Sequence, residues 1–208
     1  MSKRETRTLF ATKGETIVTT RADGGRTLSG YAAVFYDPAD KGTEYELWAG
    51  MKERISPRAF DRALAEKHDV RGLFNHDVNY LLGRTAAGTL RLSTDGKGLR
   101  YDIDLADTQA GRDVAAMVER GDLTGSSFSF VAKKTTHEDL GNKERARTID
   151  DVDLFDVGPV TFPAYNAAGG VAVRCAAENI EAARAEIEAA ERQADVAAQE
   201  RKQRVLTI

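Results

Sequence analysis

The chain has a single cysteine, Cys175, among 208 residues. One cysteine excludes an internal disulfide framework and fits a reducing compartment, so we expect a protein of the cytoplasm. A catalytic thiol is the alternative interpretation of Cys175, but no histidine lies near it in the sequence.

Long hydrophobic runs are also missing. No apolar stretch approaches the roughly 20 residues that span a bilayer, and no apolar segment of a secretory signal follows the basic start Met1–Arg7. The formal net charge is only −3, which gives no reason to expect affinity for polyanions or anionic lipids. We therefore expect neither nucleic acid nor a membrane as a partner.

The patterns of metal and nucleotide sites are absent as well. The three histidines, His68, His76 and His137, are widely spaced, and there is no His-Glu-x-x-His pattern and no cysteine pair. The sequence also lacks the Walker loop and a Gly-x-Gly-x-x-Gly loop after a strand. We therefore predict no metal and no cofactor.

Hydrophobic residues make up 41% of the chain and charged residues 30%, enough for one core beneath a charged surface. We predict a flexible N-terminus over residues 1–13, one domain over residues 14–174 and a polar helical extension over residues 175–208. The extension is rich in Ala, Glu, Arg and Gln. It is interpreted either as a solvated tail or as a helix that docks on an assembly partner.

Short strands dominate the predicted domain. Period-two patterns and turn residues indicate strands at 16–20, 27–35, 70–74, 88–93, 98–104, 123–132, 147–152 and 154–161. Helices are predicted from Ser56 to about residue 67 and over residues 109–120, where Gly121 ends the second helix. Residues 133–145 are predicted to be a charged excursion. This pattern favours an α+β fold with a barrel or strongly curved sheet over a doubly wound parallel sheet.

A histidine at a strand end is the first candidate for chemistry. His76 follows an apolar strand in the stretch Phe74-Asn75-His76-Asp77, where a rigid scaffold can present a side chain to a cleft. A surface or structural histidine is the alternative. His68 and His137 lie among charged residues, and we expect them to be solvated.

A run of serines is the second candidate. Alternation along 125–131 puts Ser127 and Ser129 on one face of a strand, opposite the face of Phe128 and Phe130. A serine hydroxyl is a weak nucleophile until an imidazole accepts its proton. An exposed face of hydroxyls is the alternative, and Ser126, on the phenylalanine face, is the rival nucleophile.

Asp156 is the third candidate. Alternation puts it on the same side of its strand as Val152 and Leu154, where a carboxylate is costly unless it is paired. A carboxylate that orients an imidazole is such a pair. The alternative is a strand-end aspartate that emerges into solvent.

Six stretches in order carry a further signal. They are Gly30–Phe35, Glu53–Phe60, Phe74–Asp77, Leu82–Leu90, Gly111–Val114 leading into Arg120–Phe130, and Leu154–Tyr165. Together they resemble the HK97-type phage prohead protease family, the capsid maturation serine proteases related to the herpesvirus assembly proteases. The family's histidine falls on His76 and its serine on Ser127. Its acidic position, commonly glutamate, falls on Asp156.

The resemblance implies a fold and a function. The fold would be a curved, barrel-like, mostly antiparallel β-sheet with flanking helices, as in the herpesvirus proteases. The function would be that of a serine endopeptidase inside the immature capsid, or prohead, in the bacterial cytoplasm. There it would cleave the scaffold, or a scaffolding segment of the major capsid protein, and often itself. Restraint by dimerisation or by confinement in the capsid is a further hypothesis.

The implied mechanism is acyl transfer. His76 takes the proton of Ser127 and later protonates the leaving amine, while Asp156 holds the imidazole tautomer. Arg84 either assists or forms a structural ion pair. One alternative function is a non-catalytic assembly or scaffolding protein that acts through its C-terminal helix. The other, an esterase, lacks the Gly-x-Ser-x-Gly elbow.

Overall fold

The computed structural model describes residues 4–10, 16–161, 185, 188–189 and 192. This part of the chain is mostly β, with few helices. Its strands are β1 (Glu5–Phe10), β2 (Ile17–Thr20), β3 (Arg26–Val34), β4 (Tyr45–Trp48), β5 (Met51–Ile55), β6 (Arg71–Leu73), β7 (Leu81–Arg84), β8 (Leu90–Thr94), β9 (Gly98–Leu105), β10 (Gly125–Gly141) and β11 (Glu144–Val160). Its helices are α1 (Asp61–Ala65), α2 (Gln109–Arg120) and the 3-10 turns η1 (Lys41–Thr43) and η2 (Thr85–Ala87).

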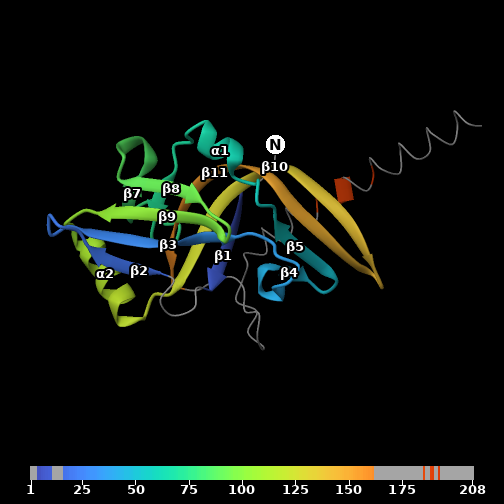
Figure 1. The fold of residues 1–208 in the computed structure, drawn as a ribbon, viewed down its shortest axis with the longest axis horizontal. Coiled ribbons are helices and arrows are strands. Elements are labelled where there is room, and N and C mark those ends of the chain that lie inside the picture. The colour runs from blue at the N-terminus through green and yellow to red at the C-terminus, as the bar shows by residue number, and fades with distance from the viewer. Residues whose placement is uncertain (1–3, 11–15, 162–184, 186–187, 190–191, 193–208) are drawn as a thin grey trace, which may run out of the picture.

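The described strands form two sheets (Figure 1). The larger has the order β1-β10-β11-β5-β4, with β6 beside β11 and β7 beside β6. The smaller has the order β2-β3-β9-β8 and is antiparallel throughout. In the larger sheet, β11 runs parallel to β5 and β6, so that sheet is mixed. Within the described residues the strands do not close into a barrel, and the curved, barrel-like arrangement stays a prediction.

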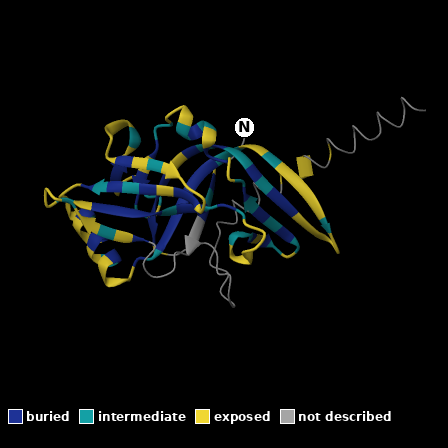
Figure 2. Ribbon diagram, in the orientation of Figure 1, coloured by how far each residue is buried: buried dark blue, intermediate teal, exposed yellow. Residues whose placement is uncertain are grey.

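One hydrophobic core takes residues from both sheets. Along β9, alternation buries Leu99, Tyr101 and Ile103 completely. From the larger sheet, the ring of Phe128 meets the ring of Phe130 at 4.9 Å between centroids. Figure 2 shows the buried residues along the middle of the strands and the exposed ones at the far end of the β10–β11 hairpin. Burial of each such side chain contributes about 1.5–3 kcal/mol, so this core is the main source of stability.

The second helix forms where the sequence predicts it. The Thr108 hydroxyl caps α2 by accepting the N–H of Gly111 at 3.2 Å, and Gly121 ends the helix with φ of 84°. The first helix is shorter than predicted and begins at Asp61 rather than at Ser56. The Ser56 hydroxyl accepts the N–H of Arg58 at 3.3 Å, which forms a local turn instead of a helix cap.

The prediction of a charged excursion at residues 133–145 is wrong. Here β10 continues to Gly141 and β11 begins at Glu144, so the two strands form one long hairpin. Its turn residues Asn142 and Lys143 have φ of 53° and 66°, the left-handed conformation that tight hairpins require. Charged side chains suit this part of β10 because most of its residues from Lys133 to Gly141 are exposed. There, for example, the Thr136 hydroxyl donates to Asp150 across the pair at 2.5 Å.

The two ends of the chain differ in how far the structure describes them. The stretch 1–13, predicted to be flexible, contains β1, which pairs antiparallel with β10. Its charged residues Glu5 and Arg7 are buried against opposite charges, which the apolar pattern of the sequence does not signal. The extension 175–208, with Cys175, lies almost entirely outside the described residues. Only residues 185, 188–189 and 192 of it are described, and they are helical.

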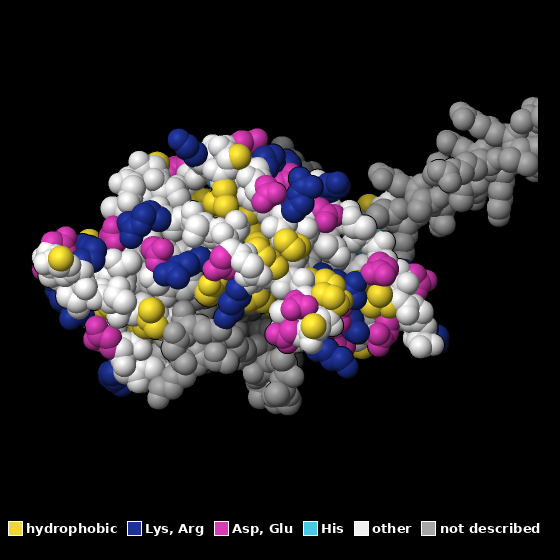
Figure 3. Space-filling model, viewed as in Figure 1, with side chains coloured by type: hydrophobic (Ala, Val, Ile, Leu, Met, Phe, Trp, Pro, Cys, Tyr) yellow, Lys and Arg dark blue, Asp and Glu magenta, His cyan; other side chains and the backbone are white. Residues whose placement is uncertain are grey.

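The surface in Figure 3 mixes positive and negative side chains, with apolar atoms gathered near the centre of this face. No helix among the described residues is long and apolar enough to cross a membrane.

Candidate active site

A β-bulge decides where Asp156 points. Ser129 of β10 lies opposite Asp156 of β11, but the next residue, Phe130, lies opposite Leu154, so Phe155 is an extra residue. The extra residue moves Asp156 from the core face of Leu154 to the face of Ser129. The predicted common face of Leu154 and Asp156 is therefore wrong. The carboxylate leaves the apolar stripe and joins the serines.

A strained loop presents His76. The loop follows β6, which pairs with β11 at Asp156 and Val157. Asn75 and His76 have φ of 55° and 57°, a left-handed conformation that is uncommon outside glycine and often found at functional sites. The amide oxygen of Asn75 accepts the N–H of Thr161 at 2.8 Å, which ties the loop to the end of β11.

Three side chains meet at this point. His76 Nε2 lies 2.6 Å from the Ser127 hydroxyl, and His76 Nδ1 lies 2.5 Å from a carboxylate oxygen of Asp156. Asp156 and Ser127 are almost completely buried, whereas a quarter of the His76 side chain is exposed. A carboxylate, an imidazole and a hydroxyl in series form the arrangement that activates a serine for acyl transfer.

Strand β1 supplies further contacts that the sequence did not indicate. The Ser127 hydroxyl donates to the backbone carbonyl of Arg7 at 2.8 Å. The guanidinium of Arg4 donates to Ser129 and to Asp156. These contacts were missed because a basic N-terminal stretch without apolar alternation gives no sign of a strand.

Comparison with known proteins identifies the family of the chain. The family model described as caudovirus prohead serine protease matches residues 15–184. The chain belongs to this family.

Family membership makes the chain a serine protease of phage prohead maturation, as the resemblance implies. Among solved structures, that of the bacteriophage T4 capsid assembly protease is similar, with a TM-score of 0.46 and 13% sequence identity. That match covers 75% of this chain and 98% of the T4 chain. No curated protein matches the chain.

The other candidate residues of the protease lie apart from His76. Ser126 is buried on the opposite side of β10, where its hydroxyl lies 2.8 Å from the Tyr101 hydroxyl. Burial raises the pKa of Tyr101 to about 12. Arg84 forms a two-pronged ion pair with Asp69, at 2.6 and 2.8 Å. The structure thus places Arg84 in an ion pair and Ser126 in the core.

The remaining histidines also lie elsewhere. His68 is largely covered, not solvated as predicted, and its Nε2 lies 3.1 Å from Glu66. His137 is exposed on β10, as predicted. Within the residues that the structure describes, no cluster of three or more His, Cys, Asp or Glu side chains is arranged to hold a metal ion.

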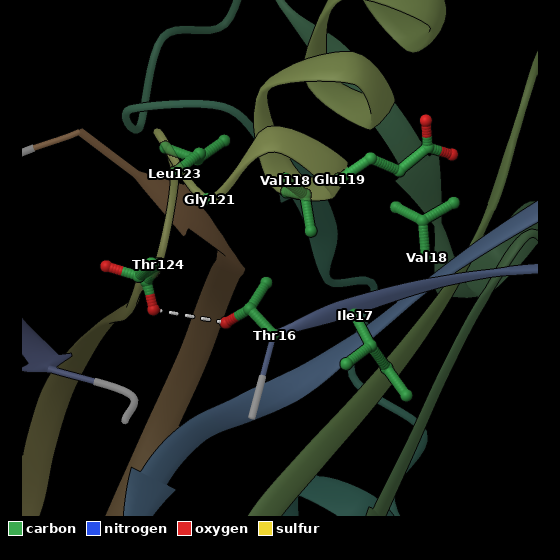
Figure 4. A pocket seen from close by; sticks show the side chains of 8 residues that line it. All are labelled: Thr16, Ile17, Val18, Val118, Glu119, Gly121, Leu123 and Thr124. Atoms are coloured by element: carbon green, nitrogen blue, oxygen red, sulfur yellow. Dashed lines mark hydrogen bonds between the residues drawn. The ribbon is translucent and has the colours of Figure 1, made fainter. Parts of the chain in front are cut away.

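A hollow of about 250 Å³ lies between β2 and the end of α2 (Figure 4). It is lined by Thr16, Ile17, Val18, Val118, Glu119, Gly121, Leu123 and Thr124. The Thr16 hydroxyl donates to the carbonyl of Thr124 there at 3.3 Å. None of His76, Ser127 and Asp156 lines this hollow, so it is separate from the candidate active site.

Proposed function

We propose that the protease acts through Ser127 as nucleophile, His76 as general base and Asp156 as the carboxylate that orients the imidazole. One observation supports this assignment above the others. The two nitrogens of His76 lie 2.6 Å from the Ser127 hydroxyl and 2.5 Å from the Asp156 carboxylate. With its Nδ1–H donated to Asp156, the imidazole turns the lone pair of Nε2 towards the Ser127 hydroxyl.

The chemistry then follows in two stages. His76 accepts the proton of Ser127 as the hydroxyl oxygen forms a bond to the scissile carbonyl carbon. When the peptide C–N bond breaks, His76 gives that proton to the leaving amine, and a serine ester remains. Water attacks the ester with the same base, which releases the acid and restores Ser127. The buried Asp156 stabilises the imidazolium in both stages.

We also propose the substrates and the setting. Membership of the prohead protease family supports cleavage of the scaffold, or of a scaffolding segment of the major capsid protein, inside the prohead in the host cytoplasm. Cleavage of the chain itself belongs to the same proposal. Residues 14–174 would form the curved protease domain, and the extension 175–208 would serve as a scaffold or docking helix. Dimerisation would restrain activity, and native mass spectrometry can measure whether the chain forms a dimer.

Co-expression with the neighbouring capsid protein tests the proposal. Intact mass spectrometry compares the wild-type chain with Ser127→Ala and with the matched control Ser126→Ala, whose hydroxyl lies on the other face of β10. We expect discrete truncation of the capsid protein, or of this chain, in the wild type and in the control but not in Ser127→Ala. The control loses the hydrogen bonds of Ser126 with Tyr101 and Thr16, a cost of about 1 kcal/mol each in stability.

Two other outcomes contradict the assignment. If Ser127→Ala gives the same products as the wild type, Ser127 is not the nucleophile. If no protein is cut while capsid-like particles still assemble, a scaffolding role of the C-terminal helix explains the chain better.

A further inference from the structure

A buried cluster of four charges joins β1 to the rest of the larger sheet. This charge cluster consists of Glu5, Arg7, Glu53 and Arg147, and each of these residues has at most 2% of its surface exposed. Arg7 donates to both carboxylate oxygens of Glu53, and Arg147 donates to Glu5 at 3.0 Å. Two positive and two negative side chains thus neutralise one another in the interior, an arrangement that is costly unless every charge has a partner.

The cluster divides between two parts of the chain. Glu53 on β5 and Arg147 on β11 lie opposite each other in the sheet and lie within the range matched by the family model. Glu5 and Arg7 lie on β1, before the first matched residue. Arg147 also contacts Glu53 at 2.8 Å. Glu53 and Arg147 therefore remain paired with each other when β1 leaves, and both face the place that β1 occupies.

The backbone of β1 lies where a peptide substrate has to lie. It forms an antiparallel pair with β10, the strand that carries Ser127, with Thr8 directly opposite the serine. Extended peptides commonly bind by adding a strand to a sheet edge in this way. Arg7 is the residue whose carbonyl accepts the Ser127 hydroxyl, at 2.8 Å. Ser127 itself has no exposed surface, so a substrate carbonyl cannot reach it while β1 is in place.

We propose that β1 fills the substrate-binding groove of the protease, and that Glu53 and Arg147 determine its specificity. Glu53 takes a basic side chain from the substrate residue whose carbonyl faces Ser127. Arg147 takes an acidic side chain two residues earlier in the substrate. The preferred substrate is an extended segment with the pattern acidic-x-basic before the scissile bond. This proposal rests on the proposed function of Ser127.

The contact at Arg7 also explains why β1 can occupy the groove without being cleaved. The Ser127 hydroxyl points its proton at the carbonyl oxygen of Arg7, whereas attack requires the serine oxygen to approach the carbonyl carbon. In this state the proton that His76 must accept is shared with β1. Displacement of β1 frees the groove and lets a substrate carbonyl take the same position.

Two matched variants separate specificity from the anchoring of β1. Glu53→Gln and Arg7→Gln break the same buried ion pair, from opposite sides. Both variants are expected to loosen β1 and so to increase the cleavage of added peptides. Only Glu53→Gln changes the domain itself, so only this variant is expected to alter which peptides are cut.

The probes are synthetic peptides based on residues 4–10, Arg-Glu-Thr-X-Thr-Leu-Phe, with arginine, glutamine or glutamate at X. The measurement is kcat/KM for the full-length wild type and the two variants. We expect wild type and Arg7→Gln to prefer arginine over glutamine by about 10-fold or more, because glutamine cannot replace the contacts of an arginine with both carboxylate oxygens of the buried Glu53. For Glu53→Gln we expect this preference to fall to nearly equal rates.

Three results overturn the proposal. One is a wild-type or Arg7→Gln chain that cuts the glutamine peptide as well as the arginine peptide. The second is a Glu53→Gln chain that keeps the full preference. The third is failure to cut any of these peptides by a chain that does cut the capsid protein in a Ser127-dependent way.

If a variant does not fold, the sites that the wild type cuts in the co-expressed capsid protein decide the question. We expect a basic residue before the cut, and its absence overturns the proposal. If no Ser127-dependent cut occurs in any protein or peptide, the proposed function fails instead.

Discussion

At the scale of single residues, the local backbone determines where the side chains of His76 and Asp156 point. His76 is fixed by its left-handed backbone and by Asn75, which bonds to Thr161. Asp156 is directed towards His76 by the bulge at Phe155. The motifs of the sequence identify these residues, but alternation alone places Asp156 on the wrong face. A bulge cannot be derived from a regular period of two.

The negative charge of Asp156 is expected to be essential for activity, whereas one additional methylene in the side chain should be tolerated. Asp156→Asn keeps the shape but favours the wrong imidazole tautomer, so kcat/KM should fall by about 10³–10⁴-fold. Asp156→Glu restores the charge, and glutamate is common at this position in the family that the sequence resembles, so most activity should remain. Kinetics of both variants on one cleaved substrate test this. Equal activity of Asp156→Asn and the wild type would remove Asp156 from the mechanism.

At the scale of elements, the close approach of β6 to β11 positions the histidine loop. Gly158 lies opposite Ser127, and a Cβ added there would lie 2.1 Å from the carbonyl oxygen of Leu73, at the end of β6. Only glycine permits this approach. His76 is three residues further along, so any shift of β6 moves the base away from Ser127.

Gly158→Ala is therefore expected to impair both activity and stability. Displacement of the loop by about 1 Å costs on the order of 100-fold in rate, and the forced contact costs about 1–3 kcal/mol in the free energy of unfolding. Kinetics and urea unfolding measure the two effects. Gly96→Ala is the control, because its added Cβ meets nothing within 4 Å. An unchanged rate in Gly158→Ala would show that the approach of β6 does not position His76.

The elements also show what the sequence can predict. Helix α2 matches its predicted bounds because cap residues and periodicity are local signals. The β8–β9 hairpin forms as predicted for the same reason. The part of the β10–β11 hairpin at residues 133–145 was not predicted because a charged, exposed strand carries no apolar alternation. The parallel pairing of β11 with β5 and β6 was missed because it joins residues that are far apart in the sequence.

At the scale of the whole molecule, the charge cluster links the N-terminal strand to the centre of the larger sheet. Burial alone would raise the pKa of Glu5, but the hydrogen bond from Arg147 and the charges of Arg7 and Arg147 outweigh it. The pKa of Glu5 in the folded chain therefore lies below its ordinary value of 4.5. The sequence predicts a flexible segment here because paired buried charges leave no hydrophobic signature.

This lowered pKa predicts how stability depends on pH. A group whose pKa is lower in the folded chain stabilises it fully above the unfolded value of 4.5, and this stabilisation is lost as pH falls through the folded pKa. Urea unfolding should show wild type more stable than Glu5→Gln by about 3 kcal/mol at neutral pH. The difference should shrink in acid, below the ordinary pKa. A difference that stays constant into strong acid would contradict the burial of an ionised Glu5.

Covalent labelling with a fluorophosphonate probe measures whether His76 activates Ser127. The full-length wild type, His76→Ala and Ser127→Ala are incubated with the probe, and the labelled residue and its rate are determined by mass spectrometry. We predict one adduct, on Ser127, which forms slowly because the serine is covered. It should form at least 100-fold more slowly in His76→Ala and not at all in Ser127→Ala. An adduct on another serine, no adduct on Ser127, or equal rates in wild type and His76→Ala would contradict the activation of Ser127 by His76.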